Sequence, residues 1–349
     1  MVEIAQAYYD RNLTQQEIAG MFGISRSQIS RYLQEARERD IVQIRVLRPG
    51  ARVVALENAL RQHFPHLGQA IVAAAFSDDD TMRRRAAARE AARLLERVVR
   101  PNSTVCFGAG RTLAETVNLL RPRRLRDVTV VQALGNAGHE ALEIDYNAVA
   151  SAAAAAFGGR AVQINAPALL GREMRSTDLE ASNPQIREAI AIARAADVFM
   201  VGIGSLSGDE IYVQTGLVSV DELREARAAG AVGDICGNFF DIAGRPRPGP
   251  FVGRAVGIRL SDLSAAPLAI GCASGEEKVA SIVGALNGRY LNVMVTDELT
   301  ATGVLESIGD TSPLSRTGRA AAGGTRGAER AGGNGARSAD DARQRGGPE

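Results

Sequence analysis

The feature that most constrains the fold is an alternation of short apolar runs with helical segments between about Ala51 and Leu305. The runs are rich in β-branched residues, and helical segments of about 10–15 residues separate them. This alternation favours a parallel sheet covered by helices, that is, an α/β domain. The expected strands are Thr104–Phe107, Val128–Leu134, Ala161–Asn165, Val198–Ile203, Ala255–Ile258, Leu268–Cys272 and Leu291–Val295.

The segment before this domain has the signals of short helices joined by tight turns. Thr14 and Glu17 are spaced as a capping box, in which each residue bonds the backbone N–H of the other. Ser25 and Gln28 repeat this spacing after Gly23, which ends the preceding helix. Two helices joined by a short turn that contains glycine predict a helix-turn-helix unit.

The exposed side of the last helix in this unit is polar and basic. Arginine and glutamine side chains near the start of a recognition helix can read base edges, and serine hydroxyls suit phosphates. The alternating run Ile41–Val46 predicts a strand of a wing. A three-helix protein-interaction module is the alternative. The residues expected to contact DNA are Thr14, Gln15, Ser25, Arg26, Ser27, Gln28, Ser30 and Arg31.

Composition excludes several classes of protein. The chain has 349 residues, 45% of them hydrophobic, and 41 basic against 40 acidic residues, which excludes wholesale disorder and a cationic nucleic-acid coat. It lacks an apolar run long enough to span a bilayer, and Met1–Ile4 does not resemble a signal peptide. Three cysteines and three histidines lack the spacing of metal ligands. We therefore expect a soluble, cytoplasmic protein with no metal and no cofactor.

Three regions follow from these patterns. Residues 1–50 are expected to bind DNA, residues 51–310 to bind an effector and form oligomers, and residues 311–349 to be a disordered tail. The first region has seven arginines against six acidic residues, so one copy should hold DNA weakly. A homodimer or homotetramer is therefore expected.

The first candidate anion site follows the strand Thr104–Phe107. Its residues are Gly108, Ala109, Gly110, Arg111 and Thr112, and a helix comes next. Glycines between a strand and a helix expose backbone N–H groups at the positive end of the helix dipole, where a phosphate can bind. A Walker A loop would need a lysine here, and a dinucleotide fingerprint would need glycine in place of Leu113. The loop is either a ligand loop or a tight structural turn.

Two further segments are candidates for the same sheet edge. Lys278 is the only lysine in an arginine-rich chain, and it follows Leu268–Cys272 at the start of a helix that Ser274 and Glu277 are expected to cap. A cation at that end of a helix favours a nearby anion, although a solvated surface lysine is the alternative. In the glycine-rich run Gly230–Asp241, Asp234 can accept hydroxyl groups of a sugar, or the run is a structural crossover.

The chain resembles the SorC-type sugar-binding transcriptional regulators. The resemblance rests on Ala7–Arg37 in the first region and, in the second, on Asp197–Leu206, Gly230–Asp241, Gly275–Lys278 and Asn292–Glu298. The resemblance implies a Rossmann-like effector domain, similar to sugar-phosphate isomerases and deaminases, that senses a ligand without turning it over. It also implies a phosphate at Gly108–Thr112 and a sugar at Asp234 and Lys278, with Gln132 at the pocket edge. Ala109 and Arg111–Thr112 differ from the commoner form of the family loop, which leaves open whether the ligand is phosphorylated.

Three functions remain to be compared. The first is a transcriptional regulator that binds double-stranded operator DNA under the control of a sugar or sugar phosphate. A repressor is the commoner expectation, although these residues equally allow an activator. The second is a phosphosugar isomerase or deaminase with an added helical domain, in which His139, Asp234 and Lys278 are the candidates for chemistry. The third is a non-enzymatic assembly protein. The polar helix near the amino end favours the first.

Overall fold

The computed structural model describes residues 1–9, 11, 13–39, 41–42, 51–75, 77, 79–136, 145–206, 213, 218–247 and 251–309. The expected tail at 311–349, most of the expected wing strand (residues 43–46) and His139 lie outside these residues.

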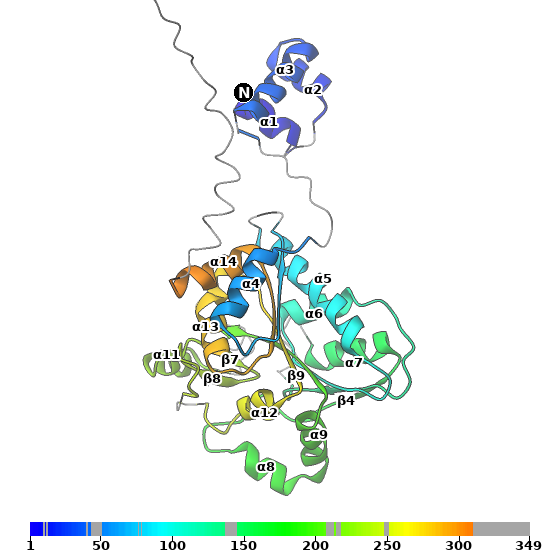
Figure 1. Ribbon diagram of the computed structural model, residues 1–349, viewed down its shortest axis with the longest axis vertical. Helices are drawn as coiled ribbons and strands as arrows, with labels where there is room; N and C mark the ends of the chain where they lie inside the picture. Colours follow the sequence, from blue (N-terminus) through cyan, green and yellow to red (C-terminus); the bar gives the residue numbers. More distant parts are fainter. Residues whose placement is uncertain are drawn as a thin grey trace, which may run out of the picture. The chain divides into compact units, whose positions relative to one another are not determined.

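The amino-terminal unit contains α1 (Val2–Tyr9), α2 (Gln15–Phe22) and α3 (Arg26–Glu38), which enclose a small apolar core (Figure 1). Both expected capping boxes are confirmed. The Thr14 N–H donates to Glu17 Oε2 over 2.8 Å, and the Ser25 N–H donates to Gln28 Oε1 over 2.9 Å. Gly23 ends α2 with φ of 64°, in the left-handed region where glycine is favoured. These local signals therefore set the boundaries of both helices in the turn.

Within the described residues, the α/β domain has a seven-stranded sheet in the order β1-β10-β9-β5-β2-β3-β4, with every pairing parallel. The strands are β1 (Gln69–Ala73), β2 (Thr104–Phe107), β3 (Thr129–Gln132), β4 (Arg160–Val162), β5 (Val198–Gly202), β9 (Leu268–Cys272) and β10 (Val293–Asp297). The strand order reverses between β2 and β5, because the chain runs outward to β4 and then returns. The carboxyl ends of strands at such a switch point commonly border a ligand site.

Helices cover both faces of this sheet (Figure 1). On one face lie α5 (Asp80–Val98), α6 (Arg111–Asn118) and α7 (Tyr146–Phe157); on the other lie α4 (Val54–His63), α9 (Pro184–Arg194), α12 (Leu260–Ala265), α13 (Val279–Asn287) and α14 (Glu298–Ser307). Alternate strand residues enter the two cores: Val198 and Met200 face the first set of helices, and Phe199 faces the second. Both faces are buried, which explains the continuous apolar runs in the sequence.

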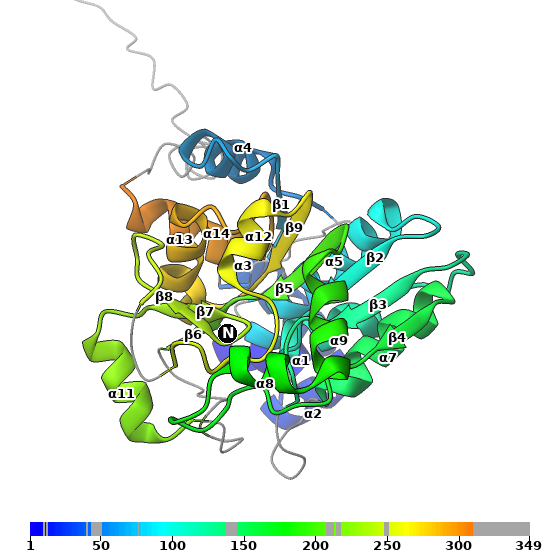
Figure 2. The ribbon, with the colours of Figure 1, turned by 90° about the horizontal axis from the view of Figure 1, so that it is seen from below.

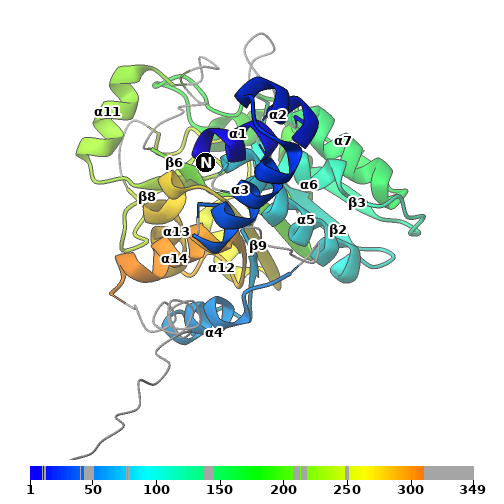
Figure 3. The same ribbon diagram turned by 90° about the horizontal axis from the view of Figure 1, so that it is seen from above.

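A small antiparallel sheet of β6 (Gly204–Ser205), β7 (Gly233–Ile235) and β8 (Asn238–Phe240) continues from β5. Together with α11 (Val220–Ala228), it lies at the side of the domain away from β3 and β4 (Figures 2 and 3). The glycine-rich run Gly230–Asp241 therefore forms the hairpin of β7 and β8.

Several strand predictions were wrong. β1 was not predicted, because alanine occupies two of its five positions and weakens the strand signal. The three short strands of the small sheet, β6, β7 and β8, were not predicted either. Ala255–Ile258 is not a strand: Ala255 and Gly257 make isolated antiparallel bridges with Leu169 and Leu134. This run is buried by packing at the sheet edge without joining the parallel sheet. Ile41 and Val42, at the start of the expected wing, form a bend.

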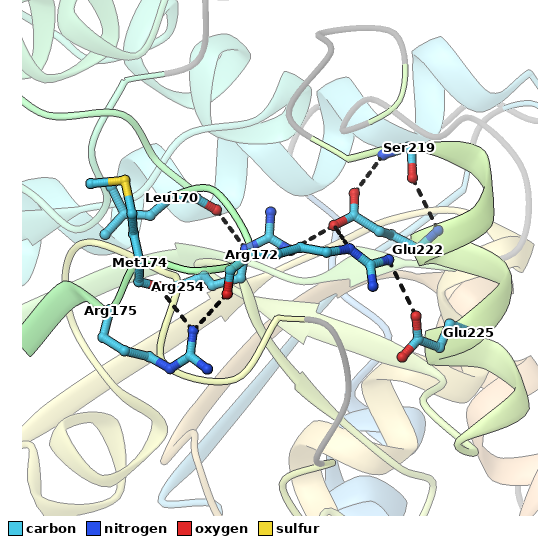
Figure 4. Close-up of polar contacts among 8 residues, drawn as sticks. All are labelled: Leu170, Arg172, Met174, Arg175, Ser219, Glu222, Glu225 and Arg254. Atoms are coloured by element: carbon cyan, nitrogen blue, oxygen red, sulfur yellow. Dashed lines mark hydrogen bonds and ion pairs between the residues drawn. The ribbon is translucent and has the colours of Figure 1, made fainter.

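A buried ion pair attaches α11 to two loops of the α/β domain (Figure 4). Arg254 donates to Glu222 over 2.7 Å and to the carbonyl oxygen of Leu170, and its guanidinium carbon lies 5.5 Å from the centre of the Phe251 ring. The side chains of Arg254 and Glu222 are 5% and 9% exposed. Arg172, which is 55% exposed, adds a bond to Glu222 over 3.1 Å. The network fixes α11, the helix that lies between β6 and β7 in the chain.

In the part of the chain that the structure covers, no helix has the length and apolar character needed to cross a membrane.

Candidate functional site

A cavity of about 120 Å³ opens at the carboxyl ends of β2, β5 and β9, where the strand order reverses. Loops after all three strands contribute to it, and so does the small sheet. Its lining includes the expected Ala109, Gly110, Arg111, Thr112, Asp234 and Lys278. The structure thus brings together six of the eight residues expected to bind an effector, from three segments that are far apart in the chain.

The Gly108–Thr112 loop connects β2 to α6 and contributes four of its residues to the cavity. Gly110 has φ of 135°, which L-residues with a side chain rarely adopt, and it precedes Arg111 at the first position of α6. The N–H groups in the first turn of a helix lack acceptors within the helix and carry its positive partial charge. Gly108 is not among the described residues that line the cavity, and its N–H donates to the carbonyl oxygen of Met200 over 2.8 Å. The loop has the backbone form of an anion site.

Asp234 reaches the cavity from β7 and is 1% exposed. One of its oxygens, Oδ2, accepts the N–H of Gly237 over 2.9 Å. The carboxylate passes so close to Gly204 that a Cβ atom at position 204 would lie 1.9 Å from Asp234 Oδ1. Glycine at this position therefore makes room for the carboxylate in the cavity wall.

Lys278 lies in a 3-10 turn, Glu276–Lys278, which leads directly into α13. The capping box expected between Ser274 and Glu277 is wrong, because the Ser274 hydroxyl instead donates to Asp297 Oδ2 over 2.7 Å. Gly275, with φ of 128°, begins the turn. Ser274, Glu277 and Lys278 all line the cavity. The segment thus presents an ammonium, a hydroxyl and a carboxylate to one space.

Gln132 is not among the cavity-lining residues that the structure describes. Its side-chain amide donates to Asn136 and Asn147 over 3.1 and 2.8 Å, and its Oε1 accepts the N–H of Ile164 over 2.7 Å. It is 2% exposed, and these bonds join three segments of the chain. These bonds give Gln132 a structural role at the edge of the sheet. Its contact with an effector stays a prediction.

Several cavity residues were not predicted from the sequence. Arg84 enters from α5, and Tyr146 enters from the first position of α7, immediately after the Asp145 cap. Cys236 and Cys272 also line the space, and burial, with the nearby aspartates, raises the pKa of both thiols. The cysteines are therefore uncharged near neutral pH. Arg84, Arg111 and Lys278 set three cations against the carboxylates of Asp234 and Glu277.

The expected DNA-binding residues lie at the start of α2, from its cap Thr14, and along the start of α3, from its cap Ser25. Arg26, Ser27, Ser30 and Arg31 are exposed, whereas Gln28 is half-buried. Thr14, Ser25 and Gln28 are also engaged in the two capping boxes. A groove of about 520 Å³ beside α1 and α2 is lined by Tyr8, Tyr9, Leu13, Thr14, Gln15, Gln16 and Arg26. Arginine and hydroxyl groups thus share one exposed surface.

Across the described residues, no group of three or more histidine, cysteine, aspartate or glutamate side chains is arranged to hold a metal ion.

Comparisons with known proteins agree with both parts of the chain. The Sugar-bind family model, which describes a sugar-binding domain, matches residues 49–306, and the model of sigma-70 region 4 matches residues 3–39. The chain is 32% identical over 317 residues to the sorbitol operon regulator of Klebsiella pneumoniae, covering 86% of this chain and 96% of that protein. It is 28% identical over 307 residues to the deoxyribonucleoside regulator of Bacillus subtilis, covering 88% and 97%.

Structural comparison gives the same result. The crystal structure of the full-length sorbitol operon regulator SorC from Klebsiella pneumoniae matches with a TM-score of 0.67 and 30% identity, covering 87% of this chain and 97% of that one. The parallel sheet, the amino-terminal helices and the extent of the sequence match point to one conclusion. The chain belongs to the SorC family of sugar-binding transcriptional regulators.

Proposed function

We propose that this protein binds operator DNA through α3 and that a sugar or sugar phosphate in the cavity changes its affinity for that DNA. The observation that carries the proposal is the convergence of Gly110, Arg111, Asp234 and Lys278 on one cavity at the switch point of the sheet. Relatives named as regulators of a sorbitol operon and of deoxyribonucleosides support a small carbohydrate as the effector.

The chemistry of the lining suits a ligand with one anionic end and several hydroxyl groups. Arg84, Arg111 and the amino end of α6 offer positive charge for a phosphate, and Asp234 offers a buried acceptor for hydroxyl groups. The cavity volume of about 120 Å³ favours a monosaccharide-sized ligand over a dinucleotide.

The proposed role is sensing and not catalysis. The named relatives are regulators, which favours a binding function for the shared domain. A turnover assay on pentose and hexose phosphates tests this point, and product formation that depends on Asp234 or Lys278 would contradict it. A regulator of this kind acts in the cytoplasm, as a dimer or tetramer on a palindrome-like operator, and we expect effector binding to release the DNA.

We expect phosphorylated sugars to raise the melting temperature of the full-length protein more than their free counterparts. A ligand that binds only the folded state adds about 2.7 kcal/mol at a hundred times its Kd, which corresponds to about 5–10 °C for a domain of this size. Thermal unfolding with matched pairs, such as glucose and glucose 6-phosphate, measures the difference. Equal shifts for both members of every pair that binds would show that the Gly108–Thr112 loop does not hold a phosphate.

We expect Arg31→Ala to weaken operator binding by about 1–3 kcal/mol, because an arginine at the start of a recognition helix contacts bases or phosphates. Titration of a duplex from the protein's own promoter region, at several salt concentrations, measures the affinity and its salt dependence. Arg37→Ala is the matched control, since Arg37 is also exposed but lies in the last turn of α3. Wild-type operator affinity in Arg31→Ala would show that the DNA surface has been assigned to the wrong residues.

A further inference from the structure

Asp297, at the carboxyl end of β10, holds the turn that carries Lys278. Its side chain is completely buried and does not line the cavity. Oδ2 accepts the hydroxyl groups of Ser274, over 2.7 Å, and of Thr300. Thr300 Oγ1 in turn accepts the N–H of Gly275 over 2.9 Å. Two bonds that depend on Asp297 therefore fix both residues that begin the Glu276–Lys278 turn.

The same residue caps α14. Oδ1 of Asp297 accepts the N–H groups of Leu299 and Thr300 over 3.0 and 3.1 Å. A neutral side chain of the same shape cannot accept all four bonds, because an amide has one oxygen. At a fully buried position, water cannot replace the missing acceptor. The position of the Lys278 turn thus depends on the charge of Asp297.

Asp297 is also linked, through β1, to the first described residues of the α/β domain. In the parallel pair of β1 and β10, Asp297 lies opposite Ala73, and Ala73 forms an antiparallel bridge with Arg52. The N–H of Val53 donates to the carbonyl oxygen of Val72 over 2.9 Å, and the N–H of Ala74 donates to that of Ala51 over 3.0 Å. Residues 51–53, here called the joint, follow the segment 43–50 that leads from the DNA-binding helices.

A second buried carboxylate holds the joint. Glu57 is 6% exposed and accepts the N–H of Val72 over 2.9 Å. It also accepts two bonds from the Arg52 guanidinium, over 2.6 and 2.7 Å, in the bidentate geometry that gives strong ion pairs. The joint is therefore attached to β1 by both backbone and side-chain bonds. The amide of Ala75, just after β1, donates to Glu298 over 3.0 Å, which ties the same region to the residue after Asp297.

We propose that Asp297 is a positioning residue of the effector site and that it couples the Lys278 turn to the joint through β10 and β1. The proposal rests on the proposed function, because it assigns the route by which an effector in the cavity acts on the DNA-binding helices. An effector that favours one position of the turn shifts Ser274 and Gly275, and the buried bonds of Asp297 transmit that shift to the strand pair. The strand pair carries it to Arg52 and Val53.

Hydrogen exchange on the full-length protein, without DNA or sugar, tests the coupling. We expect Asp297→Asn to speed hydrogen exchange of the 275–278 amides about tenfold, which is the change for one lost bond to a buried charge. Exchange of the amides of residues 51–53 and 72–75 should become faster by about threefold or more. Thr300→Val is a milder second variant, because it removes the acceptor of the Gly275 N–H and leaves Asp297 in place. Faster exchange that stays within residues 275–278 in both variants would overturn the coupling.

The reverse perturbation provides an independent test. Coupling is reciprocal, so Glu57→Gln should speed exchange at the joint and also at residues 275–278. Asp241→Asn is the matched control: Asp241 is 3% exposed and accepts the N–H of Arg245 over 2.8 Å, but it does not line the cavity. Equal acceleration of both segments in this control would show general loosening and would also overturn the proposal. A wild-type protein that binds neither operator DNA nor a sugar would contradict the proposed function. The exchange rates expected for these variants do not depend on that result, so the two failures can be distinguished.

Discussion

Arg254→Ala is expected to lower the free energy of unfolding by about 3–5 kcal/mol, the cost of leaving one member of a buried ion pair without its partner. Glu222 would lose its bond of 2.7 Å to Arg254, and the carbonyl oxygen of Leu170 would lose a donor. Contact of the guanidinium with the Phe251 ring would also be lost. Chemical denaturation measured by circular dichroism gives the value, and the midpoint should shift with little change in slope.

Arg172→Ala is the control for this prediction. Arg172 bonds the same carboxylate over 3.1 Å, but its side chain is 55% exposed, and exposed ion pairs contribute about 0–1 kcal/mol. A loss in Arg172→Ala as large as that in Arg254→Ala would show that burial does not determine the strength of this network.

The same ion pair gives a pH dependence with a defined sign. Burial raises the pKa of Glu222, but the Ser219 N–H and the Arg254 guanidinium together lower it by a larger amount. The pKa of Glu222 therefore lies below the ordinary value of 4.5. A carboxyl whose pKa is lower in the folded state stabilises the fold fully above its unfolded pKa. This contribution declines as the pH falls below about 4.5 and through the folded pKa. Glu222→Gln should remove this part of the acid sensitivity.

Lys278→Ala is expected to reduce the affinity for the effector by about 2 kcal/mol, or roughly 30-fold, because a partly buried cation that faces an anionic ligand is lost. Operator affinity without effector should stay at the wild-type value, since Lys278 lines the cavity that we propose holds the effector. Calorimetric titration with the sugar phosphate that gives the largest thermal shift measures the first quantity, and duplex titration measures the second.

Two variants make this result specific. Glu276→Ala changes an exposed residue of the same turn that does not line the cavity, and it should bind effector normally. Lys278→Arg keeps the charge but replaces a compact ammonium with a planar guanidinium, so it separates charge from shape. Unchanged effector affinity in Lys278→Ala would exclude this lysine from the site.

The parts of the molecule that the sequence predicted best are those determined by nearby residues. Thr14 and Glu17 are three positions apart and cap α2 as expected, because both partners of each bond lie in one turn. Ser274 and Glu277 have the same spacing, yet Ser274 bonds Asp297, which is 23 positions away. Local patterns do not reveal such a competitor, since the strand order that brings it near is a property of the whole sheet.

The candidate site shows the same division. The Gly108–Thr112 loop, Asp234 and Lys278 follow strands or lie in unusual local sequence, and this made them recognisable. Arg84 lies in the arginine-rich α5, and Tyr146 lies in the alanine-rich α7. Nothing in these repeated residues indicates that one residue of each helix lines the cavity. Gln132 also lies at the end of a strand, but its side-chain amide forms hydrogen bonds with three neighbours. Only the packed structure distinguishes a strand-end residue that faces the cavity from one that does not.

The close approach of Gly204 to Asp234 limits how the cavity can change to accept a different ligand. Any larger residue at position 204 would displace the carboxylate, so that wall cannot be altered by single substitutions without losing the acceptor. Arg84 reaches the cavity from α5 and is only half-buried, whereas Tyr146 is 8% exposed and belongs to the apolar core on that face of the sheet. Natural or laboratory diversification of ligand preference should therefore accumulate at Arg84, while the glycine and the aspartate change together or stay as they are.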